Sequence, residues 1–190
     1  MISLIYWHPV VYRTTMNVLF ALSNYNLKEE YKKIAEEVGS LSVLDLCCGD
    51  CYFKKFIPNN TYTGIDFNKT FIKWASKKGI NAENRDVLKE NLPSADCVVM
   101  LASLYHFLPT SQEAILQKMI DSAKKKVIIS EPVENISSGQ AGLFGKFLSN
   151  PGGEYTGQRF SREQLISLYK KFNASKIMDM GRTMIGVFEK

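Results

Sequence analysis

The chain has 190 residues, of which 45% are hydrophobic and 23% charged. This length suits a single domain with a buried core, and the composition excludes an intrinsically disordered chain. Much of the formal net charge of +5 comes from lysine runs at 54–55, 77–78 and 124–126. We interpret these runs as solvated helix ends rather than as a surface that binds polyanions.

The N-terminal sequence MISLIYWHP lacks the basic start of a signal peptide, and Pro9 and Arg13 interrupt its apolar stretch. No apolar run reaches the roughly 18 residues that a membrane-spanning helix needs. We therefore expect a cytoplasmic protein without a membrane span. Residues 16–22 have the composition of an apolar helix.

The first well-marked helix is predicted over 26–39. Asn26 is placed to cap it, with Glu29 at the capping-box position, and Gly39 ends it. Its apolar residues recur at helical spacing, namely at Tyr31, Ile34, Ala35 and Val38. We expect this helix to pack against the sheet just before the first strand, and residues 1–38 to form an N-terminal helical cap.

The most informative stretch is 43–66. The apolar run VLDL leads into the turn CCGDC, and a second apolar run ends at Asp66, 21 positions after Asp45. Gly49 in the turn can adopt a positive φ and lets a ligand approach the backbone. A carboxylate that leaves the second strand is placed to accept hydrogen bonds from both ribose hydroxyls. The pattern predicts a nucleoside site at the carboxyl ends of two parallel strands.

The sequence DLCCGDC at 45–51 resembles the first motif of class I S-adenosylmethionine-dependent methyltransferases, Asp-hydrophobic-Gly-x-Gly-x-Gly, with Gly49 on the central glycine. Cys47 and Cys51 replace the other two glycines. A dinucleotide loop needs those glycines for close approach of the pyrophosphate, whereas S-adenosylmethionine carries no phosphate. The departure favours a methyl donor over a nicotinamide cofactor, and a nicotinamide oxidoreductase is the weakest alternative.

Later segments keep the order of this family. The sequence GID at 64–66 resembles the second motif, whose acid binds the ribose, and RDV at 85–87 resembles the third, whose aspartate meets the adenine amino group. Residues 95–107 resemble the fourth strand with the loop beneath the methionine moiety, and 127–132 resemble the fifth strand. The resemblance covers about 40–190. It implies these cofactor-binding residues: Asp45, Cys47, Cys48, Gly49, Asp66, Phe67, Asp86, Val87, Leu101 and Ala102.

The remaining elements alternate between strands and helices. Strands are predicted near residues 43, 62, 82, 97 and 127, with two more in 175–190 on either side of Gly181. Helices are predicted over 50–57, 68–78, 110–124 and 161–172, with capping-box spacings at Thr110/Glu113 and Ser161/Gln164. This alternation predicts a doubly wound, Rossmann-like α/β sheet in one domain spanning 1–190. The family implies seven strands in the order 3-2-1-4-5-7-6, with the last strand antiparallel.

Methyl transfer from a sulfonium requires alignment of the acceptor and at most one positioned base. His106, in the loop after the fourth strand, is the best-placed candidate base because its side chain titrates near neutrality. Tyr105 beside it is the second catalytic candidate. Many relatives carry an aromatic or histidine pair at this loop to enclose the methionine end, so packing is an equally open role for His106. Further candidates are Glu131, His8 and Tyr155.

Residues 133–160 hold six glycines interleaved with apolar and aromatic residues. We hypothesise that this insertion and residues 1–25 form a lid over the crevice at the carboxyl ends of the strands, with aromatic side chains that shape an apolar pocket. A surface loop with ordinary core anchors is the alternative.

We expect a methyltransferase that acts on a small, apolar molecule by direct in-line transfer and releases S-adenosylhomocysteine. The sequence ASLY at 102–105 stands where enzymes that methylate base amino groups carry Asn-Pro-Pro-aromatic, so no nucleic-acid partner is expected. The alternatives are an RNA or protein methyltransferase, which would bind its acidic partner with a steep salt dependence, and a non-catalytic cofactor-binding module. A structural zinc site needs about four ligands, and the cysteines and histidines are not spaced for one, so neither a metal nor a disulfide is expected.

Overall fold

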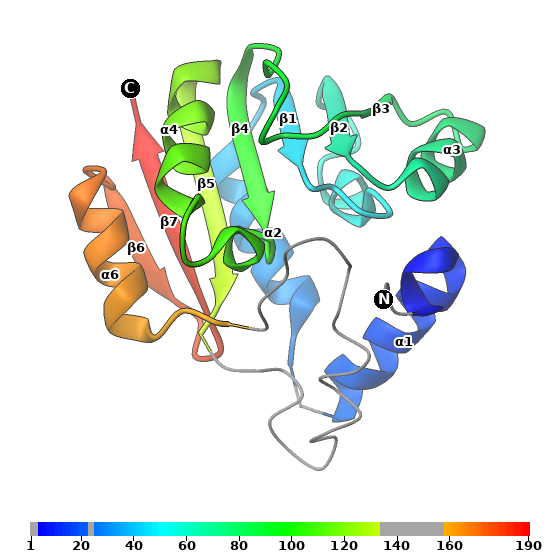
Figure 1. Ribbon diagram of the computed structural model, residues 1–190, viewed down its shortest axis with the longest axis horizontal. Coiled ribbons are helices and arrows are strands. Elements are labelled where there is room, and N and C mark those ends of the chain that lie inside the picture. The colour runs from blue at the N-terminus through cyan, green and yellow to red at the C-terminus, as the bar shows by residue number, and fades with distance from the viewer. Residues whose placement is uncertain (1–3, 23–24, 134–157) are drawn as a thin grey trace.

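The computed structural model describes residues 4–22, 25–133 and 158–190. These residues form a seven-stranded sheet with the order β3-β2-β1-β4-β5-β7-β6 (Figure 1). The strands are β1 Val43–Leu46, β2 Tyr62–Asp66, β3 Ala82–Asn84, β4 Ala95–Leu101, β5 Ala123–Pro132, β6 Lys176–Asp179 and β7 Thr183–Glu189. The predicted fold class and strand order are confirmed.

Strand β1 lies between β2 and β4 and is parallel to both, so Leu46 pairs with Ile65 on one side and with Met100 on the other. All four residues of β1 are buried, as its apolar composition predicts for a strand covered on both faces. Strand β7 is antiparallel to β5 and β6, which confirms the predicted orientation of the last strand. The carboxyl ends of the parallel strands therefore meet at one edge of the sheet.

Helices cover both faces of this sheet. Helices α4 (Gln112–Ser122) and α6 (Arg162–Lys171) lie in front of it in Figure 1, and α2 (Leu27–Val38) lies behind. The core between α4, α6 and the sheet contains Ile115, Leu116, Leu165 and Tyr169. The core on the other face contains Ile34 and Val38 of α2 and Ala75 of α3 (Lys69–Lys77). The expected packing of α2 against the sheet is confirmed.

The predicted caps are confirmed at two helices. Asn26 accepts a hydrogen bond from the Glu29 amide at the start of α2, and the helix ends at Gly39. Ser161 and Gln164 form a complete capping box at the start of α6. Local side-chain hydrogen bonds to otherwise unpaired amides thus fix both starting points.

Two predicted helices were wrong in type or extent. The segment predicted as a helix over 50–57 forms only a 3-10 turn, η2 (Tyr52–Phe56), because Cys51 before it has a left-handed backbone and Pro58 limits its length. The helix predicted over 110–124 is shorter. It follows another 3-10 turn, η3 (Leu104–Phe107), and the last residues of the prediction belong to β5. The cap predicted at Thr110 and Glu113 is replaced by Ser111, whose side chain makes no capping bond.

The N-terminal segment packs at the edge of the sheet rather than on a face. It consists of the turn η1 (Leu4–Trp7) and helix α1 (Pro9–Leu22), which lies beyond the carboxyl ends of the strands in Figure 1. The carbonyl of Tyr6 accepts a hydrogen bond from Asn68 Nδ2 at 2.9 Å, and the ring of Tyr12 lies 5.3 Å from that of Phe71. These contacts join α1 to the start of α3. Residues 134–157, most of the predicted insertion, lie outside the described residues.

None of the helices in the described ranges is both long and apolar enough to cross a membrane.

Candidate functional site

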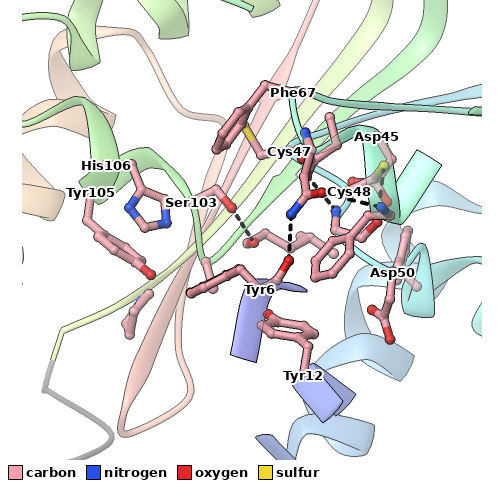
Figure 2. A pocket seen from close by; sticks show the side chains of 18 of the residues that line it. Tyr6, Tyr12, Asp45, Cys47, Cys48, Asp50, Phe67, Ser103, Tyr105 and His106 are labelled. Atoms are coloured by element: carbon pink, nitrogen blue, oxygen red, sulfur yellow. Dashed lines mark hydrogen bonds between the residues drawn. The ribbon is translucent and has the colours of Figure 1, made fainter. Parts of the chain in front are cut away.

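A cavity of about 670 Å³ lies between the carboxyl ends of the strands and α1. All the residues that the sequence assigned to the cofactor, and its two leading catalytic candidates, line this cavity. These residues are Asp45, Cys47, Cys48, Gly49, Asp66, Phe67, Asp86, Val87, Leu101, Ala102, Tyr105 and His106. Figure 2 shows Tyr105 and His106 on one side of the cavity, Cys48 and Asp50 on the other, and Tyr12 from α1 facing the space between them. The fold thus brings together residues from four separate motifs.

The loop after β1 adopts a left-handed backbone at alternate positions. The φ angles are 56° at Cys47, 53° at Gly49 and 54° at Cys51. These are the three positions where the family motif has glycine, the residue that adopts such angles without steric cost. A cysteine in this conformation costs about 1–2 kcal/mol, since its Cβ approaches the following carbonyl oxygen. The loop therefore has a left-handed backbone at all three glycine positions of the family motif. At two of them the residue is a cysteine, Cys47 or Cys51, which does not favour this conformation.

The sulfurs of this loop occupy the space beside Gly64 of β2. A Cβ on Gly64 would lie 2.8 Å from Cys48 Sγ and 3.2 Å from Cys51 Sγ, closer than packed atoms allow. The two sulfurs are 3.5 Å apart, and all four cysteines are free thiols. The absence of a side chain at Gly64 thus allows the sulfurs of Cys48 and Cys51 in the loop after β1 to pack against β2.

Asp66 is fixed at the cavity wall by two backbone amides. Gly49 N–H donates to its Oδ2 and Asn68 N–H donates to its Oδ1, both at 2.8 Å. Burial raises the pKa of this carboxyl, and the two donated hydrogen bonds act in the opposite direction. The predicted cofactor loop, residues 47–51 after β1, and the acid that ends β2 therefore form one structural unit on one side of the cavity.

Asp45 lies behind the loop. The hydroxyl of Tyr62 donates to its Oδ2 at 2.7 Å. Burial raises the pKa of Asp45 to about 7, the Tyr62 hydrogen bond lowers it, and the nearby carboxylates of Asp66 and Asp50 raise it further. Much of this group is therefore protonated near neutral pH, in contrast to an ordinary aspartate.

The third motif forms a tight turn at the cavity mouth. Asp86 Oδ1 accepts a hydrogen bond from the amide of Leu88, which orients the turn. Val87 is buried, whereas Leu88 and Phe67 keep 46% and 57% of their surface exposed. Large apolar side chains that stay exposed at a cavity mouth are suited to cover a flat ligand ring.

The loop after β4 is held by Glu131. This fully buried carboxylate accepts hydrogen bonds from the backbone amides of Ser103, Leu104 and Tyr105 at 2.8, 2.6 and 3.2 Å. Burial raises its pKa to about 7, and the three amides lower it. Glu131 does not line the cavity, so the sequence-based suggestion that it could act as a base is corrected: it positions the loop.

Tyr105 and His106 lie side by side on this loop, with ring centroids 4.0 Å apart. The guanidinium of Arg159 lies 3.7 Å from the centre of the Tyr105 ring. Burial, and then the charge of Arg159, lower the pKa of His106 to about 3. The imidazole is therefore neutral throughout the physiological range. Of the other candidates, His8 is exposed and lies outside the cavity lining, and Tyr155 lies outside the described residues.

Several lining residues were not assigned to the site from the sequence. Arg13 of α1 forms a bidentate ion pair with Asp50 in the cofactor loop, and its guanidinium lies 3.9 Å from the centre of the Tyr52 ring. Glu30 of α2 is buried and lines the cavity. A signal for Glu30 existed, because it precedes the buried Ile34 by four positions and so lies on the same helix face. The Arg13–Asp50 pair joins distant segments, and no local spacing predicts it.

Within the described ranges, no group of three or more His, Cys, Asp or Glu side chains is arranged to hold a metal ion.

Solved structures of other proteins share this fold. Magnesium protoporphyrin IX methyltransferase from Synechocystis PCC 6803, with bound S-adenosylhomocysteine, has a TM-score of 0.64 at 12% identity, over 85% of this chain and 82% of the other. The methyltransferase domain of bacterial CtHen1-CN has a TM-score of 0.66 at 15% identity, over 87% of this chain and 100% of the other. An O-methyltransferase family protein from Burkholderia thailandensis has a TM-score of 0.66 at 14% identity, over 97% of this chain and 61% of the other.

No curated protein sequence matches the chain. The family model described as a methyltransferase domain matches residues 43–126, which run from the start of β1 into β5 and include Asp45, Gly49 and Asp66 of the cavity lining. The likeness to solved structures shows the fold, and the family model covers less than half of the chain. Residues 43–126 thus match a methyltransferase domain, within a fold that a solved methyltransferase with bound S-adenosylhomocysteine shares.

Proposed function

We propose that the protein methylates a small, largely apolar molecule by direct in-line transfer. The observation that carries this proposal is the cavity, in which the cradle around Gly49 and Asp66 continues into an apolar chamber. Side chains of α1 and α2 line the chamber, among them Met16, Leu19, Phe20, Leu27 and Tyr31. A concave, mostly apolar wall with few polar groups is typical of sites for small molecules.

The cradle suits the adenosine part of S-adenosylmethionine. Each oxygen of Asp66 accepts one backbone N–H, and a carboxylate offers about four acceptor positions, so about two remain for the ribose hydroxyls. We propose that the adenine lies against Phe67 and Val87 with its amino group toward Asp86. For the methionine end we propose the residues of the β1 and β4 loops, namely Asp45, Cys47, Cys48, Leu101 and Ala102.

The bound cofactor supplies a methyl group that its sulfonium already activates. The protein therefore has to align the acceptor and exclude water. Glu131 holds the loop that carries Tyr105 and His106 and so fixes one wall of the cavity. A base with a pKa of about 3 removes protons poorly near neutral pH, so we propose that His106 acts as a neutral wall for the acceptor, as does Tyr105.

Two lysines of the runs at 54–55 and 124–126 give little support to the alternative of an RNA or protein acceptor. Lys54 Nζ donates to the carbonyls of Ile57, Pro58 and Asn60, and Lys126 Nζ donates to the Glu37 carbonyl. These ammonium groups are thus bound within the fold instead of forming a free basic surface. We also propose that 1–190 form one cytoplasmic domain in which residues 1–38 cover the cavity.

Calorimetric titration with S-adenosylhomocysteine tests the proposal. We expect the wild type to bind it and Asp66→Asn to bind it at least about tenfold more weakly, because the amide accepts fewer hydrogen bonds from the ribose. Asp121→Asn, at an exposed position at the end of α4, is the matched control and should bind like the wild type. A folded wild-type protein that binds no S-adenosylhomocysteine would contradict the proposal. Binding without methyl transfer to any small apolar acceptor would support the non-catalytic alternative.

A further inference from the structure

Glu30 is a buried acid on the cavity wall to which the proposed methyl transfer assigns no role. It lies in the first turn of α2, is only 3% exposed, and lines the cavity. Its Oε1 accepts a hydrogen bond from Ser130 Oγ at 2.5 Å, and its Oε2 accepts one from Thr183 Oγ1 at 2.9 Å. The hydroxyl of Tyr25 also donates to Oε2. Hydroxyl groups from β5, from β7 and from the residues just before α2 therefore all donate to the Glu30 carboxylate.

This carboxylate has no positive partner among the described residues. None of the ion pairs in those ranges includes Glu30, and its neighbours are the three neutral hydroxyls. Burial raises its pKa, which the hydroxyl hydrogen bonds only partly offset. A buried anion without a cation is costly, and a cationic ligand that enters the cavity would remove that cost.

The surroundings of Glu30 also suit a cation on an apolar body. The same cavity is lined by the apolar side chains of Met16, Leu19, Phe20 and Leu27, and the ring of Phe20 lies 5.1 Å from that of Tyr25, whose hydroxyl donates to Glu30. Aromatic faces attract cations, and an apolar wall excludes the water that would screen an ion pair. Glu30 thus adds a negative group to a part of the cavity lining that also includes several apolar side chains.

We propose that Glu30 is the counter-ion for a protonated amine that binds in this cavity. The inference deepens the proposed function and rests on it. Two ligands could bring the amine: S-adenosylmethionine through the α-ammonium group of its methionine end, or the methyl acceptor. The chemistry at Glu30 is the same in both cases, and binding measurements separate them.

The experiment measures binding by calorimetry to the wild type and to Glu30→Gln. The first arm compares S-adenosylhomocysteine with methylthioadenosine, which lacks the amino acid end. The second arm compares phenethylamine with phenethyl alcohol, a neutral ligand of the same size, with and without S-adenosylhomocysteine. We expect Glu30→Gln to lose at least tenfold in affinity for the amine of one arm and to keep the wild-type affinity for its amine-free partner. The arm that responds identifies the source of the amine.

Glu36→Gln is the matched control, because Glu36 lies on the same helix but is exposed and pairs with Lys33. It should bind all four ligands like the wild type. If Glu30→Gln does not fold, Ser130→Ala serves in its place. It keeps the charge of Glu30 and removes one hydroxyl, so the amine of the responding arm should bind at least as tightly as to the wild type.

Two results would overturn the inference. One is a folded Glu30→Gln variant with wild-type affinity for both amines, and the other is an equal loss for amines and amine-free partners in either variant. Failure of the proposed function gives a different pattern. In that case the wild type binds no S-adenosylhomocysteine, while the phenethylamine arm still reports on Glu30.

Discussion

The sulfur of Cys48 lies 2.8 Å from the point where a Cβ on Gly64 would stand. Gly64→Ala should therefore force the cofactor loop away from β2. We expect the free energy of unfolding to fall by about 1–3 kcal/mol, the usual cost of an overpacked core position, and S-adenosylhomocysteine to bind more weakly. Urea denaturation and calorimetry measure the two effects.

The double variant Gly64→Ala/Cys48→Ala provides the control. Removal of the Cys48 sulfur opens the closest contact, so the second substitution should restore part of the lost stability. A cycle in which the two effects simply add would show that Cys48 is not what Gly64 accommodates.

Much of the fold was predictable because local signals and topology agree. The apolar runs at β1, β2 and β4, each followed by a turn or a helix, predict a parallel sheet, and the caps at Asn26 and Ser161 fix two helices within a residue. The short η2 was mispredicted as a full helix. The left-handed backbone at Cys51 delays its start, and a pattern of side chains does not reveal a backbone angle.

The cavity residues that belong to local motifs were predictable, and those that meet through contacts distant in sequence were not. Asp66 and Gly49 belong to motifs whose spacing reflects strand and turn geometry, and the structure joins them by a hydrogen bond. Arg13 reaches Asp50 from a helix 37 positions earlier, and Glu30 meets Thr183 across 153 positions. Contacts of that range depend on how the complete chain folds, and no window of sequence contains them.

A second prediction concerns the left-handed backbone at Cys47, where φ is 56°. Cys47→Gly should leave the stability equal to or up to about 1 kcal/mol above the wild type, because the relief of strain exceeds the added freedom of the unfolded chain. Cys47→Val should destabilise by about 1–3 kcal/mol, since a branched side chain is least compatible with this conformation. Thermal and urea unfolding of both variants measure the difference.

Cys47→Ala is the control for Cys47→Gly, because alanine keeps the Cβ and hence the strain. Its stability should stay close to that of the wild type. If Gly and Val at this position proved equally stable, the left-handed conformation of the loop would be refuted.

A third prediction concerns the Arg13–Asp50 ion pair, in which both side chains are largely buried, with 20% and 4% exposure. Arg13→Ala should destabilise the protein, because it leaves the Asp50 charge unpaired next to the cofactor loop. In a double-mutant cycle with Asp50→Ala we expect a coupling of about 1–3 kcal/mol. Arg13→Lys should restore little of it, since an ammonium can neither form the bidentate pair nor stack on Tyr52 in the same way.

The exposed pair Lys33–Glu36 is the control cycle and should show no measurable coupling. Equal coupling in the two cycles would mean that burial adds nothing to the Arg13–Asp50 pair.

The last prediction concerns the pH dependence of stability through Asp45, whose pKa burial raises to about 7. Between its unfolded pKa, near 4, and the folded value, the native protein holds a proton that the unfolded chain has lost. This stabilisation is complete below pH 4 and is lost as the pH rises through 7. From pH 5 to pH 8 the wild type should therefore lose about 2–3 kcal/mol more stability than Asp45→Asn, at about 1.4 kcal/mol per pKa unit.

Urea denaturation at pH 5, 6, 7 and 8 measures both proteins. Glu131 has a raised pKa with the same sign, so both curves should fall with pH, and the difference between them isolates Asp45. The asparagine side chain can still accept the Tyr62 hydrogen bond through its amide oxygen, so the substitution removes the titration and not the contact. Parallel curves would show that Asp45 is ionised across this range.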